Sequence, residues 1–359
     1  MSRFNTRNAS MTKTRSKPYR PAELKPIIRW RSRTEALKAL HGLFNYKDRA
    51  LITIDPDPDS IASAMALKRL LWRHVQSTAI GIIRPIKRLN NLTMVRLLKL
   101  PLIQLNEKNI KDFDKYLLVD GQPSHHELFQ KVPYTAVIDH HPVKSEPDAP
   151  FVDIRPHYGA VSTMMTEYLR AAAIKPSQTL ATALIYGIKT DTRNFERQTL
   201  EEDVKAFLYL FSRANHNILR KIEISDLSLR DLALFKEAIE NKTVSRDRIY
   251  SHLEKVNSPD ILVIIAEFML KVHDISWSIV SGVHGDQLVV IVRNDGYRKD
   301  AGKAVTRAFS GLGNAGGHKA MARAEIPLAA LDPLLQRKTP TAIARFVKRR
   351  FAVGHPASK

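Results

Sequence analysis

Residues 50–71 read ALITIDPDPDSIASAMALKRLL, and the expected fold can be worked out from this stretch. Its first five residues are apolar or β-branched, which is typical of a short buried strand. Residues 61–71 carry apolar side chains at helical spacing, and the segment before them alternates aspartate with proline, which is turn composition. A strand, an acidic turn and a helix in this order form the beginning of a βαβ unit.

The same alternation of strand and helix continues along the chain. Further strand candidates are residues 79–83, 116–119 and 135–138. Helical patterns follow at residues 160–173, 178–189 and 201–214. We therefore expect an α/β fold in which a parallel sheet is covered by helices on both faces. Residues 277–283 and 287–293 predict an antiparallel pair of strands around Gly285, so we also expect a second, smaller α/β domain with a mixed sheet.

Charge is concentrated at the two ends of the chain. The formal net charge is +21, and residues 1–33 and 336–359 supply most of it. Such basic segments attract polyanions, so non-specific nucleic-acid contact and a merely solvated tail are both left open. We expect five segments, namely a disordered basic arm (1–32), a larger domain (33–214), a helical connector (215–245), a smaller domain (246–335) and a basic C-terminal tail (336–359).

Composition excludes several kinds of chemistry. The chain has no cysteine, so disulfides, zinc–thiolate sites, iron–sulfur clusters and cysteine nucleophiles are excluded. Any bound metal must be held by oxygen and imidazole ligands. No apolar run approaches the roughly 20 residues of a membrane span, and the N-terminus lacks a secretory apolar region. We expect a cytoplasmic protein without membrane contact. The weaker alternative is that the Arg- and Ser-rich start is an organellar transit peptide.

Acidic and imidazole side chains gather where predicted elements end. These residues are Asp55, Asp57 and Asp59 after the first strand, Asp120 after the third, Asp139, His140 and His141 after the fourth, and Asp191 at the end of a helix. Ligands of parallel sheets bind beyond the carboxyl ends of the strands. Any single aspartate here is explained as a helix cap or turn residue. Together they would repel one another, and a pair of divalent cations about 4 Å apart would relieve that repulsion.

Four of these segments, in order, resemble the motifs of the DHH phosphoesterase superfamily. They are residues 55–67 (DPDPDSIASAMAL), 119–120 (VD), 139–141 (DHH) and 187–195 (GIKTDTRNF). The superfamily contains RecJ-like exonucleases, oligoribonucleases, cyclic-dinucleotide phosphodiesterases and family II pyrophosphatases. Near the C-terminus, the turn Gly316-Gly317-His318 and the strand-ending Arg293 resemble the substrate-binding residues of the DHH-associated domain. The resemblance favours the RecJ-like and oligoribonuclease branch.

The resemblance implies a role for each matched residue. It makes metal ligands of Asp57, Asp59, Asp120, His140 and Asp191, with Asp120 bridging two ions. Asp139 would orient His140, and His141 would contact the scissile phosphate. Gly316, Gly317, His318 and Arg293 would bind the substrate across a cleft between the domains. The cofactors would be two divalent cations, Mn²⁺ first and Mg²⁺ second, which would generate a hydroxide nucleophile.

Two positions depart from the family pattern. Thr53 stands where the family usually has a metal-binding His, and Asp55 stands where it usually has Asn. Asp55 is therefore a candidate additional ligand that compensates for the missing imidazole. Arg323 replaces a small residue after the Gly-Gly-His turn, so it is a further candidate for substrate contact.

The expected activity is hydrolysis of phosphodiester or phosphomonoester bonds in short oligonucleotides or small nucleotides. The main alternative is a catalytically weakened protein of the same fold that binds nucleic acid or nucleotide. Cyclic-dinucleotide phosphodiesterase and pyrophosphatase activities are lesser alternatives. A homodimer is left open.

Overall fold

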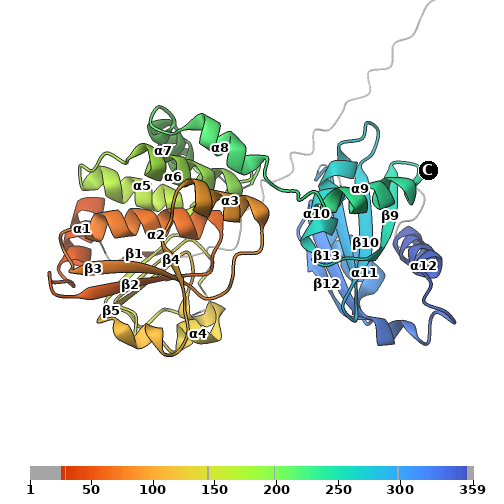
Figure 1. Cartoon of the computed structure of the whole chain (residues 1–359), viewed down its shortest axis with the longest axis horizontal. Coiled ribbons are helices and arrows are strands. Elements are labelled where there is room, and N and C mark those ends of the chain that lie inside the picture. Colours follow the sequence, from red (N-terminus) through yellow and green to blue (C-terminus); the bar gives the residue numbers. More distant parts are fainter. Residues whose placement is uncertain (1–25, 29, 144, 198, 297–298, 354–359) are drawn as a thin grey trace, which may run out of the picture. The chain divides into compact units, whose positions relative to one another are not determined.

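The structure of this chain is a computed structural model that describes residues 26–353 except residues 29, 144, 198 and 297–298 (Figure 1). Residues 1–25 of the predicted basic arm (1–32) lie outside the described residues. Two compact units are present. The first comprises the described chain up to Lys87 together with Asn91–Glu223, and the second comprises Arg88–Asn90 and the described chain from Ile224 onward.

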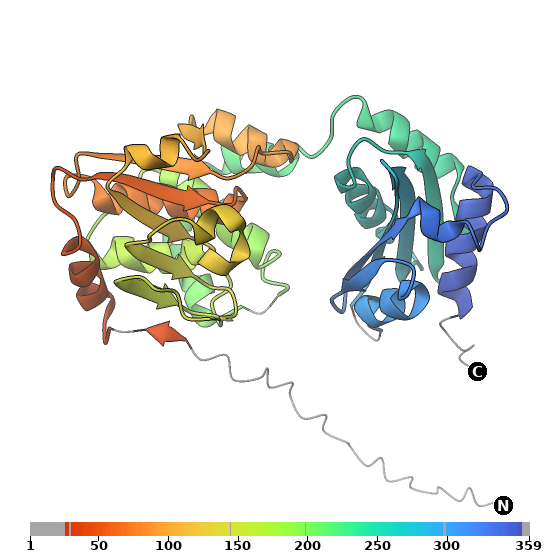
Figure 2. The ribbon, with the colours of Figure 1, turned by 90° about the horizontal axis from the view of Figure 1, so that it is seen from below.

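The first unit is built on a seven-stranded sheet in which every neighbouring pair except one is parallel (Figure 2). In spatial order the strands are β1 (Ile27–Ile28), β7 (Phe151–Ile154), β6 (Ala136–Asp139), β5 (Lys115–Val119), β2 (Arg49–Ile54), β3 (Ser77–Ile82) and β4 (Leu102–Gln104). The inner strand β2 is buried on both faces, because Leu51 packs on one side and Ile52 on the other. This double burial explains its continuous apolar sequence.

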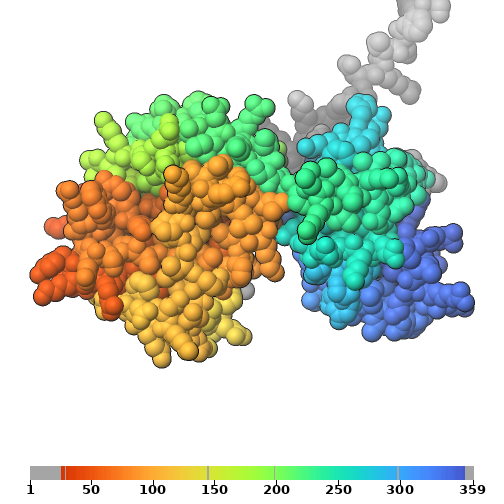
Figure 3. Space-filling model, in the orientation of Figure 1, coloured from red at the N-terminus to blue at the C-terminus, as the bar shows by residue number. Residues whose placement is uncertain are grey.

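Helices flank the sheet of the first unit, as predicted, but they cover its two faces unequally. One face carries α1 (Arg33–His41), α2 (Pro58–Leu71), α3 (Leu89–Leu97), α5 (Val161–Ala171), α6 (Gln178–Asp191), α7 (Glu201–Phe211) and α8 (His216–Glu223). The other face is covered by the short helix α4 (Glu127–Gln130), two 3-10 turns at Asn109–Asp112 and Pro123–His125, and loops. In Figure 1, α5 to α8 stack outside α2, and the side chains of α7 and α8 lie at the surface in Figure 3.

The second unit contains a mixed six-stranded sheet. Its strands, in spatial order, are β12 (Asn314–Gly317), β13 (Met321–Pro327), β11 (Gln287–Asn294), β10 (Trp277–His284), β9 (Arg248–Lys255) and β8 (Thr243–Ser245). β9 and β10 are parallel and the other pairs are antiparallel. Helices α9 (Asp231–Glu240) and α10 (Asp260–Leu270) pack on one face, and α11 (Ala301–Phe309) and α12 (Pro340–Val353) pack on the other. The α/β fold with a second, mixed sheet agrees with the prediction.

The ends of the described chain differ from the sequence expectation. Residues 336–359 were predicted to be a basic tail, but α12 buries Ile343, Phe346 and Phe351 against the second unit. These apolar residues recur at helical spacing among the basic ones, and the charge obscured that pattern. At the other end, β1 pairs with β7 and Trp30 stacks on Phe151 with ring centroids 4.2 Å apart, so ordered structure begins inside the predicted arm.

The predicted connector, residues 215–245, is also divided between ordered elements. It contains α8 in the first unit and α9 and β8 in the second. Among the helices of the described chain, none is both long and apolar enough to cross a membrane.

Candidate metal centre

Four potential metal ligands meet at the carboxyl end of the first sheet. They are Asp59, Asp120, His140 and Asp191, and one ligand atom from each lies within 4.8 Å of the others. Asp59 lies in the first turn of α2, and Asp191 is the last residue of α6. Asp120 directly follows β5, and His140 directly follows β6. The parallel strand order brings Asp120 and His140 to one edge of the sheet, and α2 and α6 bring Asp59 and Asp191 there.

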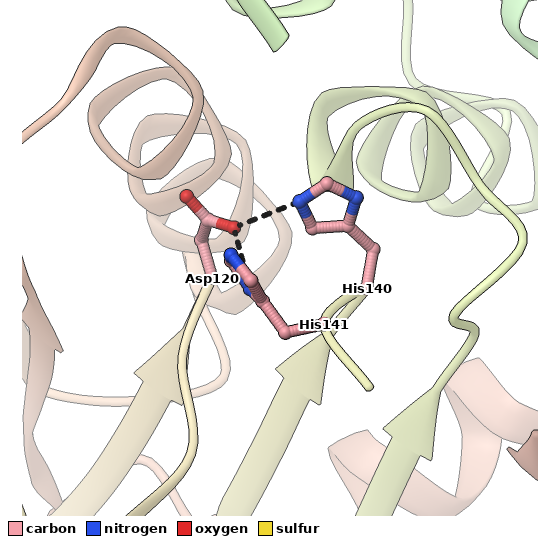
Figure 4. A group of neighbouring side chains, drawn as sticks. All are labelled: Asp120, His140 and His141. Atoms are coloured by element: carbon pink, nitrogen blue, oxygen red, sulfur yellow. Dashed lines mark ion pairs between the residues drawn. The ribbon is translucent and has the colours of Figure 1, made fainter. Parts of the chain in front are cut away.

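Asp120 lies at the centre of the group. Its backbone φ is +58°, in the left-handed region that Asp tolerates better than most residues. This turn directs the carboxylate toward the two histidines after β6, as Figure 4 shows. Its Oδ1 atom lies 3.5 Å from His140 Nε2 and 3.8 Å from His141 Nδ1. Within the described part of the chain, this buried oxygen accepts no hydrogen bond.

His140 presents its free nitrogen to the same place. Its Nδ1 lies 3.0 Å from the carbonyl oxygen of Tyr158, so Nδ1 carries the proton and donates it to that oxygen. The buried Nε2 lies 3.1 Å from Asp191 Oδ2, but no described group forms a hydrogen bond with it. A histidine that donates one ring proton to a carbonyl and offers the other nitrogen is arranged as metal-binding histidines usually are.

Asp139 is paired with a different histidine from the one expected. The sequence interpretation has Asp139 orienting His140, whereas its Oδ1 lies 2.8 Å from His141 Nδ1. Its Oδ2 accepts a hydrogen bond of 2.7 Å from Nε2 of the buried Gln122. Burial raises the pKa of Asp139, but the contact with His141 outweighs this and holds that pKa below its usual value. Asp139 therefore fixes the ring of His141, and Tyr158 fixes the ring of His140.

Asp59 is held by the backbone of a neighbouring helix. Its carboxylate accepts hydrogen bonds from the amides of Val161 (2.6 Å) and Ser162 (2.7 Å), at the start of α5. The N-cap residue of α5 is Ala160, whose side chain has no oxygen to accept from these amides, so the Asp59 carboxylate caps the helix in its place. Burial, followed by the nearby Asp191, raises the pKa of Asp59 to about 7.

The other two carboxylates of the first motif have different surroundings. Asp57 is the N-cap of α2, where its Oδ1 accepts a 2.8 Å hydrogen bond from the amide of Ser60. Burial, followed by the charge of Asp191, raises the pKa of Asp57, so it lies within electrostatic reach of the group of four without being part of it. Asp55 is 37% exposed and forms an ion pair with Arg84. The structure therefore does not bring the candidate compensating ligand Asp55 into the cluster.

Thr53 occupies the position of the missing imidazole, and its side chain is buried in β2. The hydroxyl donates to the carbonyl of Leu117 at 3.2 Å and lies 2.9 Å from the hydroxyl of Tyr134. Both hydrogen-bonding functions of Thr53 are thus occupied inside the protein. The cluster consequently has one imidazole fewer than the family pattern.

The electrostatics of the cluster fit a bound cation. Burial raises the pKa of Asp120 well above its usual value, and the charges of Asp57 and Asp59 raise it further. Burial lowers the pKa of His140, but the contact with Asp191 and the charge of Asp59 overcome this and raise it to about 10. Protons therefore neutralise the cluster in the absence of a cation. Unpartnered oxygen and imidazole atoms in a buried acidic group suit a divalent ion such as Mn²⁺ or Mg²⁺.

The candidate substrate-binding residues lie together in the second unit. Arg293, near the end of β11, has its Nε 3.3 Å from Glu267 Oε1 and is mostly buried. Gly316 and Gly317 form the end of β12, and the amide of the following His318 donates to the Met321 carbonyl at 2.7 Å. Arg323, opposite Gly316 in the sheet, forms an ion pair with Glu325 that neutralises its charge.

The sequence interpretation missed three residues around the cluster. Gln122 holds the ring of His141 through Asp139, and the Tyr158 carbonyl holds the ring of His140. The third residue, the exposed His125, forms a second group with Asp139 and His141, with ligand atoms within 4.8 Å of one another. His125 and Gln122 follow Asp120 in the same loop, which was the available signal. Tyr158 acts through its backbone, so its side chain gave no signal.

Comparison with known proteins identifies a family that part of the chain matches. Residues 49–188 match the DHH family, N-terminal domain. An uncharacterized protein of Methanocaldococcus jannaschii is 34% identical over 279 residues, which cover 77% of this chain and 57% of that protein. The chain thus spans little more than half the length of that relative.

Two solved structures share the fold. An exopolyphosphatase-related protein from Bacteroides fragilis superposes with a TM-score of 0.65 at 14% identity, covering 90% of this chain and 97% of that one. RecJ from Thermus thermophilus, solved in complex with Mn²⁺, gives a TM-score of 0.51 at 16% identity and covers 92% of this chain and 56% of that one.

Proposed function

We propose that this chain is a metal-dependent phosphoesterase that hydrolyses short oligonucleotides or small nucleotides, because residues 49–188 match the DHH family, N-terminal domain. The observation that carries the proposal is the buried group of Asp59, Asp120, His140 and Asp191, in which Asp120 Oδ1 and His140 Nε2 have no described hydrogen-bond partner. A phosphoesterase needs such a set of ligands to place cations beside a phosphate.

The residues in and around the cluster have separate roles in binding the cations. Asp120, Asp59, Asp191 and His140 would hold a pair of divalent cations, with Asp57 close enough to join them. Such cations, when bound, acidify water and neutralise charge on a phosphoryl group. Tyr158 keeps the Nδ1 proton of His140 in place, so Nε2 stays available. We propose Mn²⁺ as the first choice and Mg²⁺ as the second, and the presence of Mn²⁺ in the RecJ structure supports this order.

His141 is suited to contact the substrate phosphate. Burial lowers its pKa, but the hydrogen bond that its Nδ1 donates to Asp139 reverses the effect, so the net shift is upward. A protonated His141 is half exposed and can donate a hydrogen bond to a phosphoryl oxygen as negative charge develops there. Asp139, itself held by Gln122, keeps the ring from rotating away.

The nucleotide specificity rests on weaker support. Arg293 and the Gly316-Gly317-His318 turn resemble the residues that bind substrate in the DHH-associated domain, and the chain has a net charge of +21. The turn favours a nucleotide substrate over pyrophosphate, and the positive charge favours a negatively charged substrate of either kind. Arg323 is less suited to this role than the sequence suggested, because Glu325 already pairs with it.

The test is a substrate panel with a matched pair of variants. A dinucleotide, a cyclic dinucleotide, 3′-phosphoadenosine 5′-phosphate and pyrophosphate are each incubated with the protein in Mn²⁺, in Mg²⁺ and in EDTA. We expect Mn²⁺-dependent hydrolysis of the dinucleotide or the nucleotide, loss of that activity in Asp120→Asn, and retention in Asp112→Asn, which changes an exposed acid at a distance from the cluster. Activity that persists in EDTA or in Asp120→Asn would refute a metal-dependent mechanism.

One observation favours a second candidate function. Thr53 leaves the cluster without one family imidazole, so the chain could bind nucleotides without turning them over. The same panel distinguishes the two functions. Tight dinucleotide binding without turnover under any divalent cation would support the binding protein and contradict the enzyme.

A further inference from the structure

A pocket in the second unit is separate from the metal centre and has no role in the proposed reaction. Its volume is about 450 Å³, within the range of small-molecule sites. It lies on the face of the sheet that α12 covers, between β8, β9, β10 and the first three turns of α12. We propose that this pocket binds a small organic phosphate of the nucleoside monophosphate class.

The charge around the pocket favours an anion. Arg345 and Lys348 line it from α12, and its lining contains no carboxylate. Neither of these two residues forms an ion pair with a carboxylate in the described part of the chain. Lys348 instead lies 3.3 Å from the hydroxyl of Thr243 and above the ring of Tyr250. Thr341, in the first turn of the 14-residue α12, also lines the pocket, so the positive end of the helix dipole adds to the two cations.

His252 provides an independent indication that a ligand is expected. It is 5% exposed, it lines the pocket, and its Nε2 has no hydrogen-bond partner in the described part of the chain. Its Nδ1 lies 3.0 Å from Ser281 Oγ, and that hydroxyl lies 3.4 Å from the carbonyl of Ser251. The hydroxyl donates to this carbonyl and accepts from Nδ1, which leaves Nε2 as an acceptor.

The free nitrogen stays an acceptor at neutral pH. Burial lowers the pKa of His252 to about 4, so the ring is uncharged. A buried acceptor without a donor is unfavourable, and a ligand hydroxyl or N–H group would satisfy it. Ile279 and Val347 add apolar surface to the same pocket. A ligand that combines a phosphate, hydroxyl or amine donors and a flat ring matches all three features, and a nucleoside monophosphate has them.

The test is calorimetric titration of the full chain with adenosine 5′-monophosphate in EDTA, which removes cation-dependent binding at the metal centre. We expect saturable binding to the wild-type protein, with weaker binding of inorganic phosphate, sulfate and adenosine. The double variant Arg345→Gln/Lys348→Gln should bind the nucleotide at least about ten-fold more weakly, because it loses two charge-assisted contacts. The control Arg349→Gln removes a charge from an exposed position of α12 outside the pocket and should bind as the wild type does.

A second variant tests the histidine. His252→Phe keeps a ring of similar size and removes the acceptor, so it should reduce the preference for the nucleotide over inorganic phosphate. Circular dichroism spectra and urea unfolding curves like those of the wild type show that each variant is folded. Equal affinities in the double variant and in Arg349→Gln, or sulfate binding as tight as nucleotide binding, would overturn the proposal. Either result would reduce the pocket to a generally basic surface, whatever the outcome at the metal centre.

Discussion

Gly187 controls how closely α6 approaches α2, and replacing it with alanine should disturb the metal centre. A Cβ atom at this position would overlap Ser162 Oγ, and it would lie 3.0 Å from Asp59 Oδ1 and 3.1 Å from the Asp59 Cα. The serine hydroxyl can rotate away. The Asp59 Cα belongs to the backbone of α2, so that contact can be relieved only by moving a helix.

Two opposing effects decide the sign of the change in stability. In an exposed helix, Gly→Ala stabilises by about 1 kcal/mol through helix propensity. Inserting a methyl group into a packed interface costs about 1–3 kcal/mol. Because the backbone contact cannot relax cheaply, we expect Gly187→Ala to lower the free energy of unfolding by about 1–2 kcal/mol. The displacement also separates Asp59 from Asp191, which ends the same α6, and a misplacement of about 1 Å can cost about 100-fold in rate.

The assay is urea unfolding followed by circular dichroism, in EDTA and in Mn²⁺, together with the rate of dinucleotide hydrolysis. Gly42→Ala is the matched control, since its Cβ would meet Lys38 O at 3.4 Å and Ala39 O at 3.5 Å, which the structure can accommodate with little movement. The double variant Gly187→Ala/Ser162→Ala removes the hydroxyl overlap and leaves the contact with Asp59. If Gly187→Ala is as stable as the wild type and gains equal stability from Mn²⁺, close helix approach is not what positions Asp59.

Three further predictions concern the same region. The pKa of His140 is raised to about 10, so it is protonated at pH 7 and must lose that proton to bind a cation; calorimetry in buffers of different ionisation enthalpy should show proton release, and the cation affinity should rise with pH. Thr53→Val leaves the Tyr134 hydroxyl without its partner and should cost about 1–2 kcal/mol in urea unfolding without changing Mn²⁺ affinity. Gln122→Leu removes the hydrogen bond to Asp139 and should lower the rate of hydrolysis about 10–100-fold. An equal loss of cation affinity would contradict the inference that Gln122 acts only by holding Asp139 and, through it, the ring of His141.

The architecture of the first unit was predictable because its strands are buried on both faces. Residues 50–54 have no polar side chain except that of Thr53, and a strand that is apolar on both faces indicates a parallel sheet covered by helices. The helix α12 was not predicted, because its basic residues dominate the composition and hide Ile343, Phe346 and Phe351. Whether an apolar residue in a basic segment is buried depends on a partner surface that the local sequence does not contain.

The convergence of the cluster could be predicted from strand order and direction, whereas the pairing of its side chains could not. Strand order and direction alone bring Asp120 and His140 to the same edge of the sheet. Which histidine Asp139 contacts depends on how the chain turns after β6, and the pairing of Asp55 with Arg84 depends on the loop after β3. Neighbouring residues in extended chain point in opposite directions, so an error of one position exchanges the partners.

Asp59 shows how the fold prepares the cluster before any cation binds. The first two amides of α5 hold its carboxylate, and the partial positive charge of that helix terminus favours the ionised form. A carboxylate has about four acceptor sites, and the two amides together with the Ser63 hydroxyl, 3.4 Å from Oδ1, leave one lone pair on Oδ2 for a cation. Tyr158 likewise fixes His140 from the side away from the cluster. The ligands are therefore oriented by contacts that involve no cation, and little conformational freedom remains to be lost on binding. Cation affinity should consequently be governed by the protonation and repulsion of the cluster, and weakening the α5 contacts should lower it even when no ligand atom is changed.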